Sequence, residues 1–598
     1  MASLPNFAPP HIVAETQSDG GILIRSTDPL EPYAASVVHD FRAGSHAHPD
    51  RLLVAQRTAS GEWARLSWGA AREQVDRIAQ GMLNRHLEGK PVFILSGNSA
   101  QHLVVMLAAM TVGAPVVSVS VAYSLQSADH GRLRWMAELI KPSLVFAETA
   151  AFNDAVQVVA DVVSDVVALG PDPGIEGATT PAVFGAERTP DVAARCRALT
   201  VDAIAKILFT SGSTGYPKGV ITTHGMLSAN QQQVRQVWPF LGDEPPVLLD
   251  WLPWSHTFGG SHDLNMVLTN GGTLWIDDGR PAPTLIERTV RNFADAKPTI
   301  YFGVPAVYSA VLPWLERDRK SAEAFLARLR LGFFAAAALP QDLWDRLEKL
   351  AKAHGSRMQM TTSWGLTETS PAATSAHYPI TSSDNLGVPL PGMHLRLAPV
   401  GDLLEIRVRG PNITPGYYAR PDVTAAAFDE DGFFRTGDAA ALADAEDPRA
   451  GIVFRGRIAE NFKLDTGTFV RVGTLRPQLL SLSNGLINDA IICGENSHCV
   501  TAMVWLAAAH AARVDADGIP EQRLRAELAV VLQRLAASAE GSSQHVERLL
   551  ILTEPPQLDA GELTDKGYVN QGITRRRRAA LVALLGEDPP SPRIVMRG

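Results

Sequence analysis

The chain has 598 residues, of which 46% are hydrophobic and 20% charged, so it can bury a large core and is too long for one compact unit. Its net charge of −9 argues against a general binder of nucleic acid or of anionic membranes, because such proteins need a basic field. Three cysteines without CxxC spacing suggest neither a disulfide framework nor a zinc site, and a reducing cytoplasm is expected.

The N-terminal twenty residues lack a basic start followed by an apolar run, so we predict no secretory signal. The most apolar window, residues 103–121, is divided by Gly113 and Pro115 into a helix-like half and a β-branched half. This division predicts a buried helix followed by a buried strand, and not a membrane span.

Helical patterns alternate with short apolar runs over the first 200 residues, which is typical of βαβ units in a parallel sheet. The predicted helices are residues 68–83 and 100–111, the predicted strands are 91–95, 114–119 and 144–146, and strands at 247–252, 273–276 and 298–302 continue the sheet. The larger part of the chain is therefore predicted to be α/β.

The pattern changes at residues 386–440 to short alternating strands such as Leu403–Arg409, which predicts a small β-barrel-like subdomain. A shorter apolar pattern follows and ends in a helical segment at residues 575–585. We predict a large N-terminal domain over residues 1–456 and a smaller α+β lid domain over residues 457–598.

A string of ten residues, TSGSTGYPKG from Thr210 to Gly219, follows an apolar run and contains three glycines, four Ser or Thr hydroxyls and one lysine. Glycines let backbone amides approach phosphate oxygens, hydroxyls donate hydrogen bonds, and Lys218 supplies charge. The string does not fit GxxxxGK[ST], so an ordinary P-loop is disfavoured. A flexible Gly/Ser turn is the alternative.

The full string closely resembles the signature loop of the adenylate-forming superfamily, which includes acyl-CoA synthetases, nonribosomal-peptide adenylation domains and luciferases. The resemblance implies that this loop binds the phosphates of ATP. The loop residues that it assigns to ATP are Thr210, Ser211, Gly212, Ser213, Thr214, Gly215 and Lys218. It also implies that Thr214 contributes to a Mg²⁺ site.

Residues 364–368, WGLTE, resemble the aromatic-Gly-x-Thr-Glu element of the same family. The resemblance implies that Trp364 borders the nucleotide, that Thr367 contacts the adenylate phosphate and that Glu368 helps to hold Mg²⁺, a hard cation that prefers carboxylate oxygen. By the residues alone, Thr-Glu beside a tryptophan is also typical of a helix cap or a solvated pair.

Three small residues and two charged ones complete the implied adenosine site. Ala335, Ala336 and Ala337 stand where the family has a glycine-containing strand end against adenine, and the missing glycine falls at Ala336. Asp438, in a Thr-Gly-Asp string, and Arg457, near the hinge, match residues that reach the ribose. Core packing, a turn and a surface arginine are the alternative readings.

Lys566, in the string TDKG, matches the catalytic lysine near the C-terminus of the family, although its flanking residues differ from the commonest form. When a carboxylate attacks the α-phosphate, negative charge accumulates, and a lysine with an ordinary pKa of about 10.4 stays protonated to stabilise it. A solvated loop lysine is the alternative. Lys463 matches a lysine that contacts the nucleotide after the mobile lid rotates about the hinge.

Three segments resemble bacterial feruloyl-CoA synthetases more than fatty-acid, acetate or luciferase relatives, and the resemblance covers nearly the whole chain: residues 456–468, 333–347 and 564–571. It implies a cytoplasmic ligase of hydroxycinnamates from lignin breakdown, with ATP, Mg²⁺ and coenzyme A and with pyrophosphate released. Ala459 and Glu460 depart from the usual hinge pair. A homodimer would suit such an enzyme.

The segment WSHTFGG resembles the family's border between the acyl pocket and the coenzyme tunnel, which makes His256 a candidate at the reacting end. An aromatic acid needs a flat, mostly apolar slot. The candidate walls are His256, Phe258, Phe302, Gly303, Trp364 and Gly365, each of which could equally be ordinary core packing. The run Arg575–Arg578 is either a solvated helix face or a contact for coenzyme phosphates.

Two other functions remain open at this point. The adenylate could be formed from another acid, such as benzoate or a fatty acid, or be passed to a carrier-protein thiol, although no carrier-type serine motif follows Lys566. The chain could also be a nucleotide sensor with a decayed site, given the altered residues at positions 336 and 459.

Overall fold

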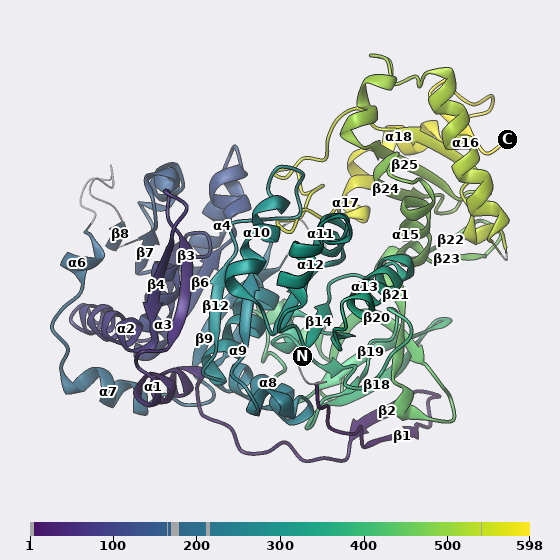
Figure 1. The fold of residues 1–598 in the computed structure, drawn as a ribbon. Coiled ribbons are helices and arrows are strands. Elements are labelled where there is room, and N and C mark those ends of the chain that lie inside the picture. Colours follow the sequence, from purple (N-terminus) through teal and green to yellow (C-terminus); the bar gives the residue numbers. More distant parts are fainter. Residues whose placement is uncertain (1–4, 164, 169–178, 211–215, 540) are drawn as a thin grey trace.

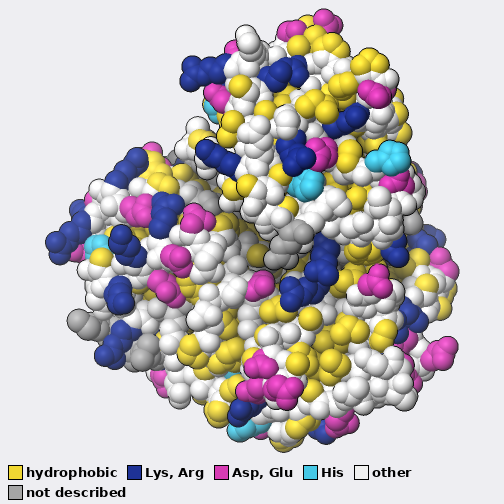
Figure 2. All heavy atoms as spheres, turned by 90° about the vertical axis from the view of Figure 1, so that its right-hand side faces the viewer, with side chains coloured by type: hydrophobic (Ala, Val, Ile, Leu, Met, Phe, Trp, Pro, Cys, Tyr) yellow, Lys and Arg dark blue, Asp and Glu magenta, His cyan; other side chains and the backbone are white. Residues whose placement is uncertain are grey.

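The structure is a computed structural model that describes residues 5–163, 165–168, 179–210, 216–539 and 541–598. Figure 1 shows a large body made by most of the chain and a smaller body, green to yellow, made by its C-terminal part. In Figure 2 the smaller body rests on the larger one. Both bodies combine sheets with helices, which confirms the predicted α/β fold.

The first sheet has six strands in the order β10-β9-β6-β5-β7-β8. They are β5 (Val92–Leu95), β6 (Val116–Val119), β7 (Leu144–Ala147), β8 (Asp165–Ala168), β9 (Ile204–Thr210) and β10 (Lys218–Thr223). All neighbours are parallel except β9 and β10. Every residue of β5, β6 and β7 is buried, which accounts for their continuous apolar sequence, because a parallel sheet is covered on both faces.

The apolar window at residues 103–121 forms a helix and then a strand, as predicted. Helix α3 (Ala100–Val112) begins at Ser99, whose hydroxyl accepts the His102 amide, and it ends at Gly113 with a φ of 75°. A left-handed φ favours glycine, so the helix stops there and β6 can follow. In the part of the chain that the structure describes, no helix is long and apolar enough to span a membrane.

The helices before residue 270 include the predicted helix 68–83, which α2 matches at both ends. They are α1 (Val37–Ala47), α2 (Trp68–Leu83), α4 (Gly131–Ile140), α5 (Asn153–Val159), α6 (Pro181–Phe184), α7 (Pro190–Arg197), α8 (His224–Val237) and α9 (Leu264–Thr269). Two segments are π-helical, η1 (Ala122–Gln126) and η4 (Phe258–Asp263).

Two further sheets follow in the large body. The first has the order β11-β12-β3-β4, with β11 (Val247–Asp250), β12 (Thr273–Ile276), β3 (Leu52–Arg57) and β4 (Trp63–Ser67), and the second is parallel, with β13 (Ile300–Gly303), β14 (Leu331–Phe334) and β15 (Gln359–Thr362). We predicted these strands as a continuation of the first sheet. They form separate sheets, since β11 and β12 pair with β3 and β4, and β13 pairs with β14 and β15.

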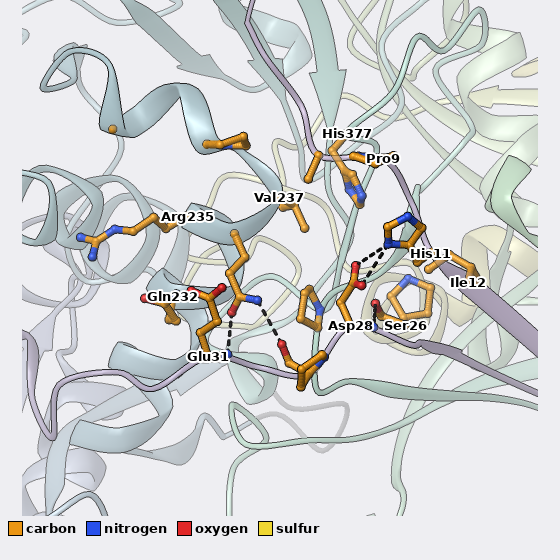
Figure 3. A pocket seen from close by; sticks show the side chains of 17 residues that line it. Pro9, His11, Ile12, Ser26, Asp28, Glu31, Gln232, Arg235, Val237 and His377 are labelled. Carbon is orange, nitrogen blue, oxygen red and sulfur yellow. Dashed lines mark hydrogen bonds and ion pairs between the residues drawn. The ribbon is translucent and has the colours of Figure 1, made fainter.

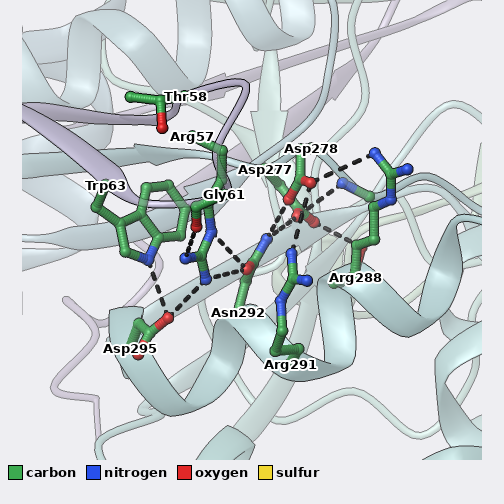
Figure 4. Close-up of polar contacts among 12 residues, drawn as sticks. Arg57, Thr58, Gly61, Trp63, Asp277, Asp278, Arg288, Arg291, Asn292 and Asp295 are labelled. Carbon is green, nitrogen blue, oxygen red and sulfur yellow. Dashed lines mark hydrogen bonds and ion pairs between the residues drawn. The ribbon is translucent and has the colours of Figure 1, made fainter.

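Helices α10 (Ile286–Ala296), α11 (Pro305–Arg317), α12 (Arg319–Leu326) and α13 (Gln341–Ala353) pack with these sheets. Figure 4 shows how charged side chains fix α10 to the β3–β4 hairpin. Arg57 Nη2 donates to Asn292 at 2.8 Å and to Asp295 at 2.7 Å, and the indole of Trp63 donates to the same Asp295 oxygen at 2.9 Å. This network is structural, since none of the predicted site residues belongs to it.

The β-rich part is a six-stranded antiparallel sheet in the order β1-β2-β18-β19-β20-β21. Its strands are β1 (Ile12–Thr16), β2 (Ile22–Ser26), β18 (His394–Val400), β19 (Leu403–Arg409), β20 (Phe434–Leu442) and β21 (Ile452–Arg457). β19 has the predicted bounds. The purple β1 and β2 lie beside the green strands in Figure 1, so the sheet extends beyond residues 386–440 at both ends.

The smaller body, which we call the lid, is built on the sheet β24-β25-β26-β27. Its elements are α15 (Val472–Leu482), β24 (Ile487–Cys493), β25 (Thr501–Leu506), α16 (Gln522–Ala537), β26 (Arg548–Ile551), α17 (Gln571–Arg577), α18 (Ala579–Leu584) and β27 (Ile594–Met596). The predicted single helix at 575–585 is two short helices separated at Arg578, whose side chain turns to the buried Glu562.

Candidate active site

The phosphate string lies in the turn between two strands. Thr210 ends β9 and Lys218 begins β10, and the two residues pair across the antiparallel hairpin. Ser211, Gly212, Ser213, Thr214 and Gly215 lie outside the described residues. Tyr216 follows them and stacks on Trp135 of α4, with ring centroids 5.4 Å apart. The hairpin therefore holds both ends of the string against the large body.

Lys218 and Glu368 meet at the ring of Tyr417. Lys218 Nζ lies 5.2 Å from the ring centroid, and the Tyr417 hydroxyl donates to Glu368 Oε1 at 2.9 Å. Burial raises the pKa of Tyr417 well above its usual value, so the phenol remains a donor. The structure thus brings together two predicted residues, and it adds Tyr417, which the sequence did not indicate because no motif surrounds it.

Thr367 and Glu368 form a short 3-10 turn directly after Trp364 and Gly365. A Cβ at Gly365 would lie 1.8 Å from the carbonyl oxygen of Pro371, so only glycine fits this close approach. Among the described residues no group of three or more His, Cys, Asp or Glu could cage a metal. The single carboxylate of Glu368 suits Mg²⁺, which takes one or two protein carboxylates and completes its shell with phosphates and water.

Asp438 is buried between two predicted partners. Its Oδ2 accepts the indole N–H of Trp364 at 3.0 Å, and Arg457, which pairs with it across β20 and β21, places Nε 3.2 Å from Oδ1. Burial raises the pKa of Asp438 above its usual value, and Arg457 opposes that shift. Oδ1 has no hydrogen-bond partner within the described residues, which leaves it able to accept from a ligand hydroxyl.

The alanine run at the end of β14 contains one strained residue. Ala336 has a φ of 71°, in the left-handed region where a side chain costs about 1–2 kcal/mol, and this is the position where the family usually has glycine. The side chains of Ala336 and Ala337 are exposed and that of Ala335 is half-buried, so the run is not core packing.

Ala336→Gly should therefore stabilise the protein. We expect the free energy of unfolding to rise by roughly 0.5–1 kcal/mol, because relief of the left-handed strain exceeds the extra chain entropy of glycine. Urea unfolding measures the change. Ala338→Gly is the matched control, because Ala338 is also exposed and its φ is not positive, and it should lower stability. Equal losses of stability in both variants would show that the backbone at Ala336 is not strained.

The predicted acyl segment forms the turn before η4 and the start of that element. Burial lowers the pKa of His256 to about 4, so its imidazole is neutral near pH 7. Phe258 packs edge-on against the buried Phe302, with centroids 6.1 Å apart. Two residues that the sequence did not indicate complete this aromatic cluster: Phe333 lies 5.0 Å from Phe302, and His262 lies 5.2 Å from it.

His262 is the polar member of this cluster. Its Nδ1 lies 2.8 Å from Asp263 Oδ1, and its Nε2 has no hydrogen-bond partner among the described residues although the ring is buried. Burial lowers the pKa of His262 to about 4. The spacing of His262 four residues after Phe258 is the signal that could have found it, since η4 places both on the same side.

Lys206 is a buried amine that contacts the acyl segment. It lies on β9, is 1% exposed, and its Nζ donates to the carbonyl oxygen of Gly260 at 2.5 Å. Burial lowers the pKa of Lys206 to about 7. Between pH 7 and its usual value of 10.5 the unfolded chain binds a proton that the folded chain does not, so folding gains stability as pH rises through this window.

Comparison of wild type with Lys206→Met isolates this effect, because methionine keeps the shape and does not titrate. We expect the stability of wild type relative to the variant to grow between pH 7 and pH 9 by up to about 1.4 kcal/mol per pH unit. Urea unfolding at each pH gives the two values. A difference that stays constant with pH would show that Lys206 is charged in the folded protein.

The lid brings Lys566 to the acyl segment. Asp565 Oδ2 lies 3.4 Å from His256 Nε2, and the exposed Lys566 beside it is close enough to contribute to the lowered pKa of His256. Lys463, by contrast, is exposed on the two-stranded ribbon of β22 (Phe462–Lys463) and β23 (Phe469–Val470) within the lid. The structure thus joins Lys566 to the site and leaves Lys463 on the lid surface.

The arginine run is not a free basic face. Arg578 donates to both oxygens of the buried Glu562, at 2.8 and 2.9 Å, and Arg577 lies 3.7 Å from the same carboxylate. Arg575 lies over the ring of Phe462, at 5.4 Å. The prediction of a solvated helix face is therefore wrong for Arg578 and Arg575, because these side chains hold parts of the lid together.

A separate cavity of about 540 Å³ lies between the N-terminal segment and α8 (Figure 3). His11 and Asp28 point toward each other in its wall, with His11 Nδ1 3.0 Å from the carboxylate, and Gln236 accepts the amide of Glu31. None of the predicted site residues lines this cavity. It is therefore distinct from the site described above.

The predicted phosphate string between β9 and β10, the buried Asp438 beside Arg457 and the lid that carries Lys566 are the features expected of an enzyme of the adenylate-forming type. Residues 41–418 match the family model described as AMP-binding enzyme. The chain therefore belongs to the AMP-binding enzyme family, which confirms the family-level prediction.

Relatives and solved structures extend this result. Long-chain-fatty-acid–CoA ligase FadD15 of Mycobacterium bovis is 25% identical over 89% of this chain and 94% of its own length, and mouse malonate–CoA ligase ACSF3 is 28% identical over 51% and 54%. The anthranilate CoA ligase AuaEII, solved with anthranoyl-AMP, has a TM-score of 0.70 at 17% identity and covers 93% of this chain and 99% of its own. That likeness shows the fold alone.

Some of these matches cover less than half of the related protein. The chain spans 46% of a Rhodococcus jostii CoA ligase and 32% of the carboxylic acid reductase of Mycobacterium marinum. The relatives named above include CoA ligases of a long-chain fatty acid and of malonate. They do not show the feruloyl branch that the sequence predicted.

Proposed function

We propose that this AMP-binding enzyme is an ATP-dependent acid–CoA ligase whose acid is aromatic, of the hydroxycinnamate type. The contact between the lid and the acyl segment carries the proposal: Asp565 lies 3.4 Å from His256, and Lys566 follows it directly. A lysine at the junction of the acid and the nucleotide suits adenylation, because a fixed cation stabilises the charge that develops there.

The proposed reaction has two steps. An oxygen of the substrate carboxylate attacks the α-phosphorus of ATP, and the bond from that phosphorus to the bridging oxygen of pyrophosphate breaks. The thiol of coenzyme A then loses its proton to solvent, its sulfur attacks the acyl carbon, and the bond from that carbon to the phosphate oxygen of AMP breaks, so that AMP leaves. Lys566 stabilises the first step, and Asp438 and Arg457 hold the ribose. Glu368 would hold Mg²⁺, which would offset negative charge on the phosphates.

The aromatic cluster supports a flat acid. Phe258, Phe302 and Phe333 have ring centroids 5.0–6.1 Å apart, and Phe258 follows His256 by two residues. Aromatic walls bind a planar ring better than a flexible chain. The unpartnered Nε2 of His262 is a hydrogen-bonding group for a polar end, such as a phenol. Benzoate, a fatty acid and a carrier-protein acceptor remain the alternatives within the same chemistry.

An assay of four acids tests the proposal. The protein is incubated with ATP, Mg²⁺ and coenzyme A, and with ferulate, p-coumarate, benzoate or a medium-chain fatty acid, while pyrophosphate and thioester are measured separately. We expect thioester from ferulate and p-coumarate at the highest kcat/KM. Adenylate without thioester would refute the ligase, a preference for the fatty acid would refute the aromatic acid, and nucleotide binding without pyrophosphate would favour a sensor.

A further inference from the structure

The loop that carries Lys566, residues 557–568, is braced within the lid. Hydrogen bonds close two turns within it: the amide of Glu562 donates to the carbonyl oxygen of Gln557 at 3.0 Å, and the amide of Thr564 donates to that of Tyr568 at 2.8 Å. The Glu562 carboxylate, 1% exposed, is bound by Arg578. The position of Lys566 relative to ATP is therefore decided by how the whole lid sits on the large body.

One carboxylate of this loop reaches across to the large body. Asp559 Oδ1 accepts the hydroxyl of Ser127 at 2.6 Å, and its Oδ2 accepts the backbone amide of Ala128 at 2.9 Å. The guanidinium of Arg132 also donates to the carbonyl oxygen of Leu558. Two acceptors on one rigid carboxylate fix a direction as well as a distance, so this contact specifies one orientation of the lid.

The segment of the large body that contacts Asp559, residues 127–135, also contacts the phosphate string. Ser127 and Ala128 follow η1, Arg132 lies in the first turn of α4, and Trp135 on the same helix stacks on Tyr216 at 5.4 Å. Helix α4 thus contacts the lid through Arg132 and contacts Tyr216 of the phosphate string through Trp135. This places the contact where closure of the lid and binding of phosphates can influence each other.

We propose that Asp559 is a positioning residue that latches the lid in the orientation for adenylation, with Ser127 and Ala128 as its receptor. The inference rests on the proposed two-step function. Asp559 acts through Lys566: when the latch is made, the braced loop presents the lysine beside His256. The transfer to coenzyme A takes place without the latch.

Separate measurement of the two steps tests the latch. Asp559→Ala should lower the rate of pyrophosphate release by about tenfold, the effect expected for losing a charge-assisted hydrogen bond, and should leave thioester formation from synthetic feruloyl-AMP unchanged. Asp517→Ala, which removes an exposed carboxylate elsewhere in the lid, is the matched control and should change neither rate. Equal loss in both steps would overturn the proposal.

A double-mutant cycle with Ser127→Ala separates the latch from local damage, because the Ser127 hydroxyl also accepts the amide of His130 at 2.9 Å. We expect the double variant to release pyrophosphate about as fast as Asp559→Ala, since both changes remove the hydrogen bond between Ser127 and Asp559. Effects that multiply would show that the two side chains act independently, and the latch would be refuted.

A disulfide cross-link tests the contact between Ser127 and Asp559 independently of enzyme activity. In the Ser127→Cys, Asp559→Cys variant, oxidised glutathione should form a disulfide that neither single-cysteine variant forms. The cross-linked protein should release one equivalent of pyrophosphate and make no thioester until it is reduced. Failure to cross-link, or thioester formation at the wild-type rate while cross-linked, would overturn the latch. If cross-linking succeeds but no acid yields pyrophosphate, the proposed function fails and the contact stands.

Discussion

Lys566→Ala should lose adenylation by a factor of roughly a hundred or more while binding ATP almost as tightly as wild type. The lysine stands beside Asp565 and His256 at the acyl segment, so its charge acts on the transition state and contributes little to ground-state binding. Pyrophosphate release measures the first quantity and calorimetric titration of ATP the second. The rate of thioester formation from a preformed adenylate should remain near that of wild type.

Lys463→Ala provides the matched comparison, because Lys463 and Lys566 are the two lysines in residues 457–598. Lys463 is exposed on the β22–β23 ribbon, so its removal should leave pyrophosphate release within a few-fold of wild type. Wild-type pyrophosphate release by Lys566→Ala would refute the catalytic assignment. Equal losses in the two variants would point to a general effect of lid charge.

Asp438→Asn should weaken the binding of ATP by about tenfold or more, because a neutral amide replaces the carboxylate that would accept hydrogen bonds from the ribose hydroxyls. The substitution keeps the shape of the side chain between Trp364 and Arg457. The dissociation constant of ATP measures the loss. Thermal unfolding of the variant checks that the buried position tolerates the amide.

A comparison with a nucleotide that lacks the two ribose hydroxyls makes this prediction specific. Wild type should bind ATP more tightly than 2′,3′-dideoxy-ATP, and Asp438→Asn should discriminate much less between them, since the missing hydroxyls and the missing carboxylate remove the same interaction. A variant that still discriminates as strongly as wild type would place the ribose elsewhere.

Much of the fold could be predicted because its local signals are strong. The bounds of α2, β12 and β19 follow from the hydrophobic pattern, since each element is bordered by turn residues or by a change of period. The partition into separate sheets could not be predicted, because it depends on pairings between segments far apart in the chain, such as β12 with β3. The two short helices at the C-terminus likewise depend on the distant Glu562.

The candidate site divides in the same way. Thr367, Glu368, Asp438, Arg457 and Lys566 could be indicated because each belongs to a string of neighbours that resembles a family motif. Tyr417 and Asp559 could not, because their roles come from contacts between segments far apart in the chain. His262 could be indicated only by its spacing from Phe258 within η4. The strain at Ala336 was indicated only as a missing glycine, and the backbone angle supplies its physical meaning.

The hairpin of β1 and β2 has a consequence for biosynthesis. These two strands are made long before β18, yet β2 pairs with β18, which emerges only after most of the large body has been made. Until then the hairpin has an unsatisfied edge, and exposed strand edges invite pairing with other chains. Nascent protein whose synthesis stalls before residue 394 should therefore be the form most prone to aggregate, and the form most in need of a chaperone.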